Sequence, residues 1–239
     1  SDFGGFGKSP KFPSPHNLLF LLRYHNAYKD PMAKTMVEKT LSKMRLGGIF
    51  DHIGFGFHRY STDQEWFLPH FEKMLYDQAM ISLAYLEAFE LTKKQEYADI
   101  AHEIFTYVLR DMTDSKGGFY SAEDADSEGE EGKFYVWTNS EINKILGPIE
   151  GKQFTDIFGF KEDGNFHDEA TGQLVSNNIP YLKNEITEYG KTNNIDIRSL
   201  KTTLEKNRIT LFKHREKRIH PLKDDKILTD WNGLMIAAL

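Results

Sequence analysis

Apolar residues lie on nearly every side of residues 69–92, which predicts a helix surrounded by other elements. Residues 94–112 instead carry apolar side chains at i, i+3 and i+4, with polar ones between, which predicts a helix with one wet face. The short link between them predicts an antiparallel hairpin, with the first helix inside and the second outside. Residues 14–28 and 30–46 repeat this plan, the second helix starting at an Asp-Pro pair.

Further helices are predicted downstream, with little strand between them. Thr138 and Glu141 form a capping box, another helix runs from near Asp196 to about residue 218, and a last one starts near Thr229. Between residues 119 and 137 an acidic stretch followed by Lys-Phe-Tyr-Val-Trp predicts a short β-hairpin. The hydrophobic pattern therefore predicts an all-α array of helical hairpins.

Glycine doublets recur at 4–5, 47–48 and 117–118, each followed by aromatic residues. The second and third follow predicted helix ends, so we expect the elaborate loops to gather at one end of the array. Loops that share a rim would form a pocket there.

Composition narrows the range of functions. The 239 residues carry a net charge of −6, which disfavours nucleic acid as a partner. No apolar run reaches about 18 residues and no signal peptide opens the chain, so we expect no membrane segment and a cytoplasmic location. The absence of cysteine excludes disulfides, thiol nucleophiles and thiolate metal sites.

Both ends of the sequence look cut, since it opens inside a glycine loop and stops in an apolar segment, 236–239. We predict a single domain over residues 1–239, truncated at both ends. Its exposed helical edge would then favour self-association.

Five stretches together form a specific signature: residues 4–13, 51–60, 66–77, 121–126 and 231–234. They run through the whole chain in order, and the sequence resembles the YyaL-type family, which includes the spermatogenesis-associated, thioredoxin-domain-containing proteins. The resemblance implies an N-terminal thioredoxin-like domain, absent here, followed by an (α/α)6 toroid similar to the six-hairpin glycosidases and the N-acylglucosamine 2-epimerases. The chain is then a partial toroid with short β-hairpins in its rim loops. It departs from the family at Phe55, where a glycine is usual, and at His167, where a carboxylate is usual.

Five polar side chains enter the otherwise apolar helix predicted over residues 69–92. On a helix starting at Pro69, His70, Lys73 and Asp77 would share one face, with Glu72 and Tyr76 on another. We expect them at the mouth of a pocket; the alternative is that they only cap the helix.

The loop before that helix carries His52 and Arg59, residues suited to proton transfer and to gripping an anionic or polyol substrate. The alternative is that Arg59 and Asp63 pin the loop to itself. Asp124 and Asp126 resemble the start of a calcium loop, but Tyr135 stands where its glutamate belongs. We therefore expect a solvated acidic turn that also reaches the pocket, and no metal site.

Tryptophans supply candidate platforms for stacking a sugar ring. Trp231 with Asn232 opens the last predicted helix and resembles a second rim segment, and Trp66 and Trp137 are similar candidates. Each tryptophan alone is more often a core residue.

Two functional hypotheses follow. The first is a carbohydrate-active toroid without a cofactor, acting on a small sugar or polyol. It is an epimerase or isomerase in which His70 and His52 exchange protons, Arg59 and Lys73 hold oxygens and Tyr76 orients a histidine, or a glycosidase using paired carboxylates such as Glu72. The second is a non-catalytic module that binds carbohydrate or protein for the thioredoxin-like domain.

Overall fold

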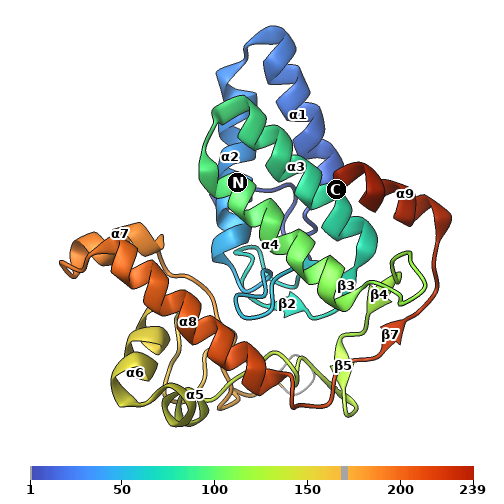
Figure 1. Ribbon diagram of the computed structural model, residues 1–239. Helices are drawn as coiled ribbons and strands as arrows, with labels where there is room; N and C mark the ends of the chain where they lie inside the picture. The colour runs from blue at the N-terminus through green and yellow to red at the C-terminus, as the bar shows by residue number, and fades with distance from the viewer. Residues whose placement is uncertain (1, 168–171) are drawn as a thin grey trace.

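The structure is a computed structural model that describes residues 2–167 and 172–239. Helices dominate this part of the chain, which confirms the all-α prediction (Figure 1). They are α1 (Pro15–Tyr28), α2 (Pro31–Leu46), α3 (Leu75–Thr92), α4 (Gln95–Asp111), α5 (Asn139–Leu146), α6 (Pro148–Ile157), α7 (Ile186–Thr192), α8 (Ile197–Arg215) and α9 (Thr229–Ala238). None of these helices is long and apolar enough to cross a membrane.

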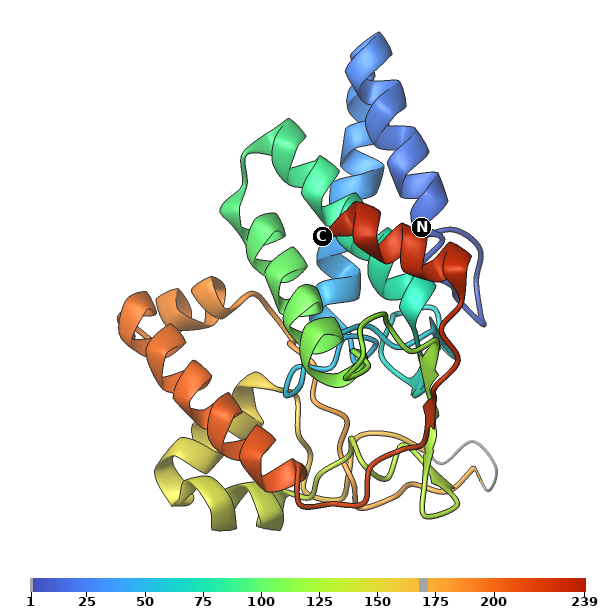
Figure 2. The same cartoon turned by 45° about the vertical axis from the view of Figure 1, so that its right-hand side comes forward.

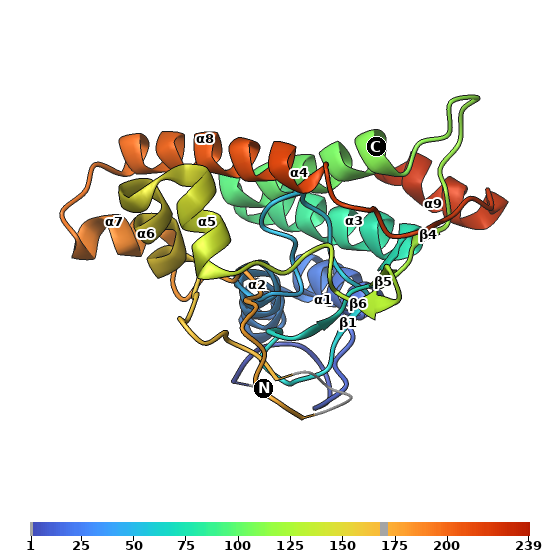
Figure 3. The same ribbon diagram turned by 90° about the horizontal axis from the view of Figure 1, so that it is seen from below.

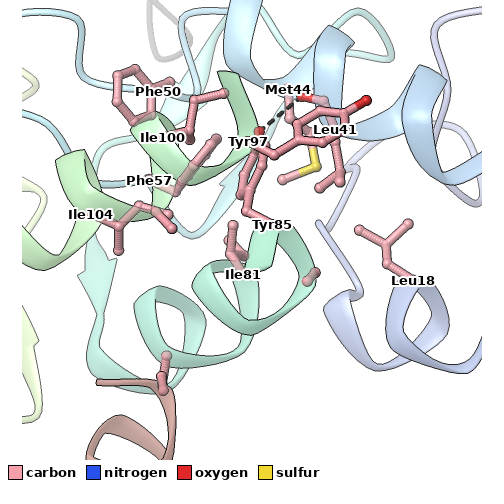
Figure 4. Close-up of a cluster of buried hydrophobic side chains, with 14 of the residues drawn as sticks. Leu18, Leu41, Met44, Phe50, Phe57, Ile81, Tyr85, Tyr97, Ile100 and Ile104 are labelled. Carbon is pink, nitrogen blue, oxygen red and sulfur yellow. Dashed lines mark hydrogen bonds between the residues drawn. The ribbon is translucent and has the colours of Figure 1, made fainter. Parts of the chain in front are cut away.

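The first four helices form two hairpins, α1 with α2 and α3 with α4, as predicted. Helix α3 is the inner member, because it packs against α1, α2, α4 and α9, and Figure 2 shows α9 lying across it. The core between these helices is continuous, and the buried Tyr85 hydroxyl donates to the Leu41 carbonyl oxygen at 2.9 Å inside it (Figure 4). Burial on all sides explains why α3 has no polar face.

Side-chain caps fix three of the helix starts at the predicted residues. The Asp30 carboxylate accepts from the Met32 amide at 2.8 Å, and Pro31 follows as the first helical residue. Thr138 accepts from the Glu141 amide at 3.1 Å, and Asp196 from the Ser199 amide at 2.7 Å. Each cap satisfies an amide that the helix leaves without a partner.

The inner helix begins at Leu75, so the predicted start at Pro69 is wrong. Residues before it form strands instead: β2 (Pro69–His70) pairs with β1 (Tyr60–Ser61), and β3 (Lys73–Met74) pairs with β4 (Ala122–Glu123), which also pairs with β7 (Lys223–Asp224). Strands β4 and β7 lie far from β3 in sequence, and β1 lies a short loop before β2; the pairings occupy backbone groups that a helical turn would need. His70, Glu72 and Lys73 are therefore not on the helix.

A short hairpin forms in this region, as expected, but its arms lie inside the acidic stretch, with β5 (Asp126–Ser127) paired to β6 (Glu130–Glu131). Its turn is made by Glu128 and Gly129, both at positive φ, the geometry of a tight two-residue turn. Residues 133–137 were the predicted second arm, but they are not in a strand apart from a single bridge at Trp137.

Helices α5 to α8 surround a second core below the hairpins, as Figures 1 and 3 show. Helices α6 and α7 were not predicted. The two regions meet at the loop 47–58 between α2 and α3, where the Leu182 amide donates to the Leu46 carbonyl oxygen at 2.8 Å.

The first two glycine doublets meet at Trp66. A Cβ on Gly5 would lie 2.5 Å from the Trp66 ring, and one on Gly47 would lie 2.2 Å from the Trp66 carbonyl oxygen. These positions require glycine because no space is left for a side chain. Phe55 has a φ of 73° and so adopts the left-handed region that glycine favours.

Candidate functional site

Seven residues form a polar cluster, here called the rim cluster, at the end of α3 where the strands meet it. Pairing of β1 with β2 places Tyr60 opposite His70, and the β5–β6 hairpin reaches the same point. The first turn of α3 and the first turn of α9 complete it. Its members are Arg59, His70, Glu72, Tyr76, Asp77, Glu131 and Trp231.

His70 lies between two carboxylates. Its Nδ1 is 2.7 Å from Oε1 of Glu131, and its Nε2 is 3.7 Å from Oε2 of Glu72. The ring stacks on Tyr60 with centroids 4.9 Å apart. The hydrogen bond to Glu131 raises the pKa of His70 above its ordinary 6.5, against the opposing effect of burial. The shift favours the protonated ring between the two carboxylates.

Arg59 and Glu72 form an ion pair inside the rim cluster, with Nη1 and Oε2 2.8 Å apart. The buried Nε of Arg59 has no hydrogen-bond partner among the described residues. Arg59 also interacts with Tyr76, and it does not bind Asp63, whose carboxylate instead accepts backbone amides at 65, 67 and 68.

Asp77 is buried in the first turn of α3, with 6% of its surface exposed, and its Oδ2 has no hydrogen-bond partner among the described residues. Burial raises its pKa to about 8, with Arg59 opposing the shift and Glu72 adding to it. Asp77 is therefore mostly protonated at neutral pH, while Glu72 beside it is paired with a guanidinium. Two carboxyl groups held in opposite environments are the usual basis of acid and base roles.

Aromatic residues border the rim cluster. Tyr76 contacts Trp231 of α9 edge to face, with centroids 4.8 Å apart, and both rings are half-buried. Burial raises the pKa of Tyr76, with Asp77 adding to the shift. Together they give a wall that a sugar ring can pack against.

Lys73 lies in a separate network that is buried throughout. Asp51 Oδ2 accepts from Nζ of Lys73 at 2.9 Å and from Nη2 of Arg215 at 2.9 Å. Lys73 also donates to the Phe55 carbonyl oxygen at 2.9 Å, and 1% of its surface is exposed. Burial lowers the pKa of Lys73 to about 8, with Asp51 opposing. Lys73 therefore has no atom accessible to a substrate, contrary to the predicted binding role. Its charge pairs with Asp51 inside the fold instead.

His52 also lies away from the rim cluster. Arg45 donates to its Nδ1 at 2.9 Å, so Nε2 carries the proton and donates to the Gly47 carbonyl oxygen at 3.0 Å. Burial lowers the pKa of His52 to about 3, and Arg45 adds to the shift. A histidine that is uncharged at neutral pH, with both nitrogens engaged, is not the proton-transfer partner of His70 that the sequence suggested.

Three more residues that were predicted to bind substrate are engaged inside the protein instead. Trp66 and Trp137 are fully buried, so neither ring offers a face to a ligand. Lys11 covers the Trp66 ring at 4.5 Å, and Arg218 covers that of Trp137 at 4.0 Å. Asn232 accepts from the Phe119 amide at 2.7 Å and donates to its carbonyl oxygen at 3.0 Å, which ties α9 to the third glycine loop.

The acidic turn is solvated, in line with the simpler expectation for it. Asp124 and Asp126 are exposed, and the Asp124 carboxylate accepts from the Asp126 amide at 3.2 Å. No set of three or more metal-binding side chains gathers within residues 2–167 and 172–239.

Sequence reasoning missed Glu131 and Arg215. Glu131 is one of several acids in the acidic stretch, and only the turn at 128–129 aims it at His70, 61 residues away. Arg215 lies near the end of the helix predicted from Asp196, and 164 residues separate it from Asp51, so nothing in the sequence pointed to their contact. The Glu128-Gly129 pair was the one available signal, because it predicts a tight turn.

The chain is similar to curated proteins over nearly its whole length, although no family model matches it. It is 40% identical to human spermatogenesis-associated protein 20 over 257 residues, covering 99% of this chain and 33% of the relative. The mouse protein of that name is 39% identical, and an uncharacterized protein of Caenorhabditis elegans is 35% identical over 262 residues, covering 100% of this chain and 36% of the relative. The chain therefore spans about a third of the length of these relatives.

Solved structures with a partial likeness are sugar epimerases and glycoside hydrolases. The cellobiose 2-epimerase of Bacillus thermoamylovorans aligns at a TM-score of 0.47 with 15% identity, covering 63% of this chain and 43% of that one. A sugar epimerase from a ruminal bacterium aligns at 0.45 with 14% identity, covering 95% and 70%. A family 76 mannosidase of Bacteroides thetaiotaomicron aligns at 0.42 with 13% identity, covering 87% and 56%.

Proposed function

We propose that the rim cluster is the centre of a carbohydrate-active domain that moves protons on a small sugar, as an epimerase or isomerase does. The observation that carries the proposal is the convergence of His70 and Asp77 beside Glu72 and Arg59. The pKa of Asp77 is raised to about 8 by burial, and the pKa of His70 is raised above 6.5 by its hydrogen bond to Glu131, so two groups able to carry a proton meet at one point.

In this mechanism His70 takes the proton from the carbon beside the sugar carbonyl. Glu131 holds its Nδ1–H, which leaves Nε2 for the substrate and stabilises the charge that develops on the ring. Asp77, protonated at neutral pH, donates a proton or a hydrogen bond to the carbonyl oxygen as negative charge builds there. The guanidinium of Arg59, whose side chain is 39% exposed, binds a neighbouring oxygen, and Trp231 supports the ring.

The test is exchange of a carbon-bound proton. The protein is incubated in D2O with reducing sugars such as glucose, mannose, N-acetylglucosamine and cellobiose, and loss of the proton beside the carbonyl is followed by NMR. We expect exchange with the parent protein and none with His70→Gln, because glutamine cannot take the proton. His102→Gln, on the exposed face of α4, is the matched control and should exchange normally. Folding of His70→Gln should stay within about 1–2 kcal/mol of the parent.

Other outcomes assign other functions. Hydrolysis of an aryl glycoside that requires Asp77 and Glu72 but not His70 would assign paired-carboxylate glycosidase chemistry. A non-catalytic carbohydrate-binding module is the second candidate, because Tyr76 and Trp231 border the rim cluster with two half-buried aromatic rings. Sugar binding that survives His70→Gln but is lost in Trp231→Ala, with no exchange in any variant, would assign that role.

A further inference from the structure

Three charged residues that do not belong to the rim cluster lie side by side across the three-stranded sheet at the base of α3 (Figure 1). The register places Glu123 of β4 opposite Lys73 of β3 on one side and opposite Lys223 of β7 on the other. Residues directly opposite each other in a sheet point to the same face, so these three side chains share one face. The Tyr107 ring lies 4.3 Å from Nζ of Lys73 and 6.0 Å from Nζ of Lys223. The two amines are therefore neighbours, with one carboxylate between them in the sheet.

The ion pairs around these residues join three cations to two carboxylates. Asp51 pairs with both Lys73 and Arg215 at 2.9 Å, and Glu123 pairs with Lys223. All of these residues except Lys223 are buried, each with no more than 5% of its surface exposed. Because one cation in this network lacks a full counter-charge, a proton leaves it more easily than it leaves an exposed lysine.

Lys223 is the cation that can give up this proton. A guanidinium stays charged in proteins, which excludes Arg215. Lys73 uses its ammonium protons in hydrogen bonds to Asp51 and to the Phe55 carbonyl oxygen, both at 2.9 Å. Loss of a proton from Lys73 would break one of these buried bonds, whereas Lys223 has only its pair with the carboxylate beside it.

The other charges that face Lys223 come from the end of α4. Burial lowers the pKa of Lys223 to about 8; Asp111 opposes the shift, and Lys73 and Arg110 add to it. Arg110 and Asp111 pair with each other, so together they add little net charge. At pH 7 about a tenth of Lys223 is then uncharged, against less than about one part in a thousand for an ordinary lysine.

Lys223 is also the amine of the two that a small molecule can reach. It lies on β7, an edge strand of the sheet, and its side chain is 25% exposed, against 1% for Lys73. The Tyr135 hydroxyl donates to Glu123, so this carboxylate keeps a partner when Lys223 is neutral. A desolvated amine next to another cationic group is the usual setting of a nucleophilic lysine.

We propose that Lys223 is a nucleophilic amine that condenses with small aldehydes, open-chain hydroxyaldehydes among them. Nζ adds to the aldehyde carbon, and its two protons pass through the Glu123 carboxylate to the aldehyde oxygen. The oxygen leaves as water when the carbon–nitrogen double bond forms, so one amine and one aldehyde give one imine and one water. Nothing is oxidised or reduced in this step.

The test traps the imine by reduction. The whole chain is incubated with glycolaldehyde and cyanoborohydride, which converts each imine into a stable secondary amine, and the labelled lysines are identified by peptide mass spectrometry. Lys226 is the internal control, because its side chain is 69% exposed and its hydrogen bond to Asp224 raises its pKa. At pH 7.5 we expect Lys223 to be labelled at least about tenfold faster than Lys226.

The pH profile and two variants test the cause of this reactivity. Labelling of Lys223 should have its midpoint near pH 8, and that of Lys226 above the ordinary lysine value of about 10.4. Asp111→Asn should move the Lys223 midpoint to lower pH, because it removes the charge that opposes the shift, whereas the exposed control Asp225→Asn should not.

Unfolding supplies the last control. In guanidinium chloride the two lysines should be labelled at equal rates, because the sheet and its ion pairs are gone. Equal labelling in the folded protein at pH 7.5, a Lys223 midpoint near pH 10, the same midpoint in both variants, or a preference that survives unfolding would overturn the proposal. His70→Gln should leave the labelling unchanged, so the result is independent of the rim cluster.

Discussion

Replacing Asp51 by asparagine should destabilise the protein more than any other single change of one carboxylate. The Asp51 carboxylate accepts from the Ile53 and Gly54 amides at 3.0 and 2.9 Å, from both terminal nitrogens of Arg215 at 2.9 Å, and from Lys73 Nζ at 2.9 Å. The side chains of Lys73 and Arg215 are 1% and 3% exposed. Asparagine keeps the shape but removes the charge that neutralises both.

The magnitude follows from burial. Breaking a buried pair from one side costs about 3–5 kcal/mol, because the partner remains as an uncompensated charge. That is a large part of the about 5–15 kcal/mol that stabilises a typical domain. Urea unfolding of Asp51→Asn at pH 7 should therefore show a much lower midpoint, while the exposed control Asp225→Asn should stay within about 0.5 kcal/mol of the parent.

The stability that the Asp51 carboxylate contributes should fall in acid. Burial alone would raise the pKa of Asp51, but Arg215 and Lys73 overcome it and hold the pKa well below the ordinary value. The stabilisation is therefore complete above the unfolded pKa of about 4 and is lost as pH falls below it towards the folded pKa. The gap between parent and Asp51→Asn should narrow in acid. A loss under about 1 kcal/mol at pH 7, or a gap that widens in acid, would refute the reasoning.

Three further results are expected. Gly47→Ala should destabilise the fold by about 3 kcal/mol or more in urea unfolding, because its Cβ would lie 2.2 Å from the Trp66 carbonyl oxygen, whereas Gly233→Ala in α9 meets no atom within 4 Å and should be neutral or stabilising. Glu131→Gln should lower the pKa of His70 in an NMR titration, since its largest cause is that hydrogen bond; an unchanged pKa would contradict the geometry. Asp77→Asn should raise the urea midpoint at pH 7. The folded pKa of Asp77 is about 8 and its unfolded pKa about 4, so the parent loses stability as pH rises between these values, whereas the Asp77→Asn variant does not. The two proteins should be equally stable at pH 4, which is the internal check.

Several features of the fold could be predicted from residues that are neighbours in the sequence. Asp30-Pro31 and Thr138 with Glu141 each specify a helix start through a bond within three residues, and the structure begins α2 and α5 there. The all-round apolar pattern after Leu75 likewise predicted that α3 would be the inner helix. Such features depend on neighbours in the sequence, so the sequence alone displays them.

Features that depend on distant partners were not predictable in this way. The apolar pattern extends back towards Pro69, but pairing with Ser61 and Glu123 turns those residues into strands. The same holds for the site. His70 belongs to the rim cluster because Glu131 reaches it, and His52 does not because Arg45 and Gly47 occupy its nitrogens. The partners of His52 lie within seven residues of it, whereas His70 meets Glu131 only through the fold, 61 residues away.

The three-stranded sheet has a consequence for how the chain is made. Its middle strand pairs Glu123 with Lys73 on one side and with Lys223 on the other, so the last partner leaves the ribosome about 100 residues after the middle strand. At about 5–20 residues per second, that is a delay of roughly 5–20 s. During it the base of α3 lacks one edge, and Asp51 lacks Arg215. The nascent chain would spend this time with the Asp51–Lys73 pair lacking its Arg215 cover and a strand edge open, a period in which chaperones have most to bind.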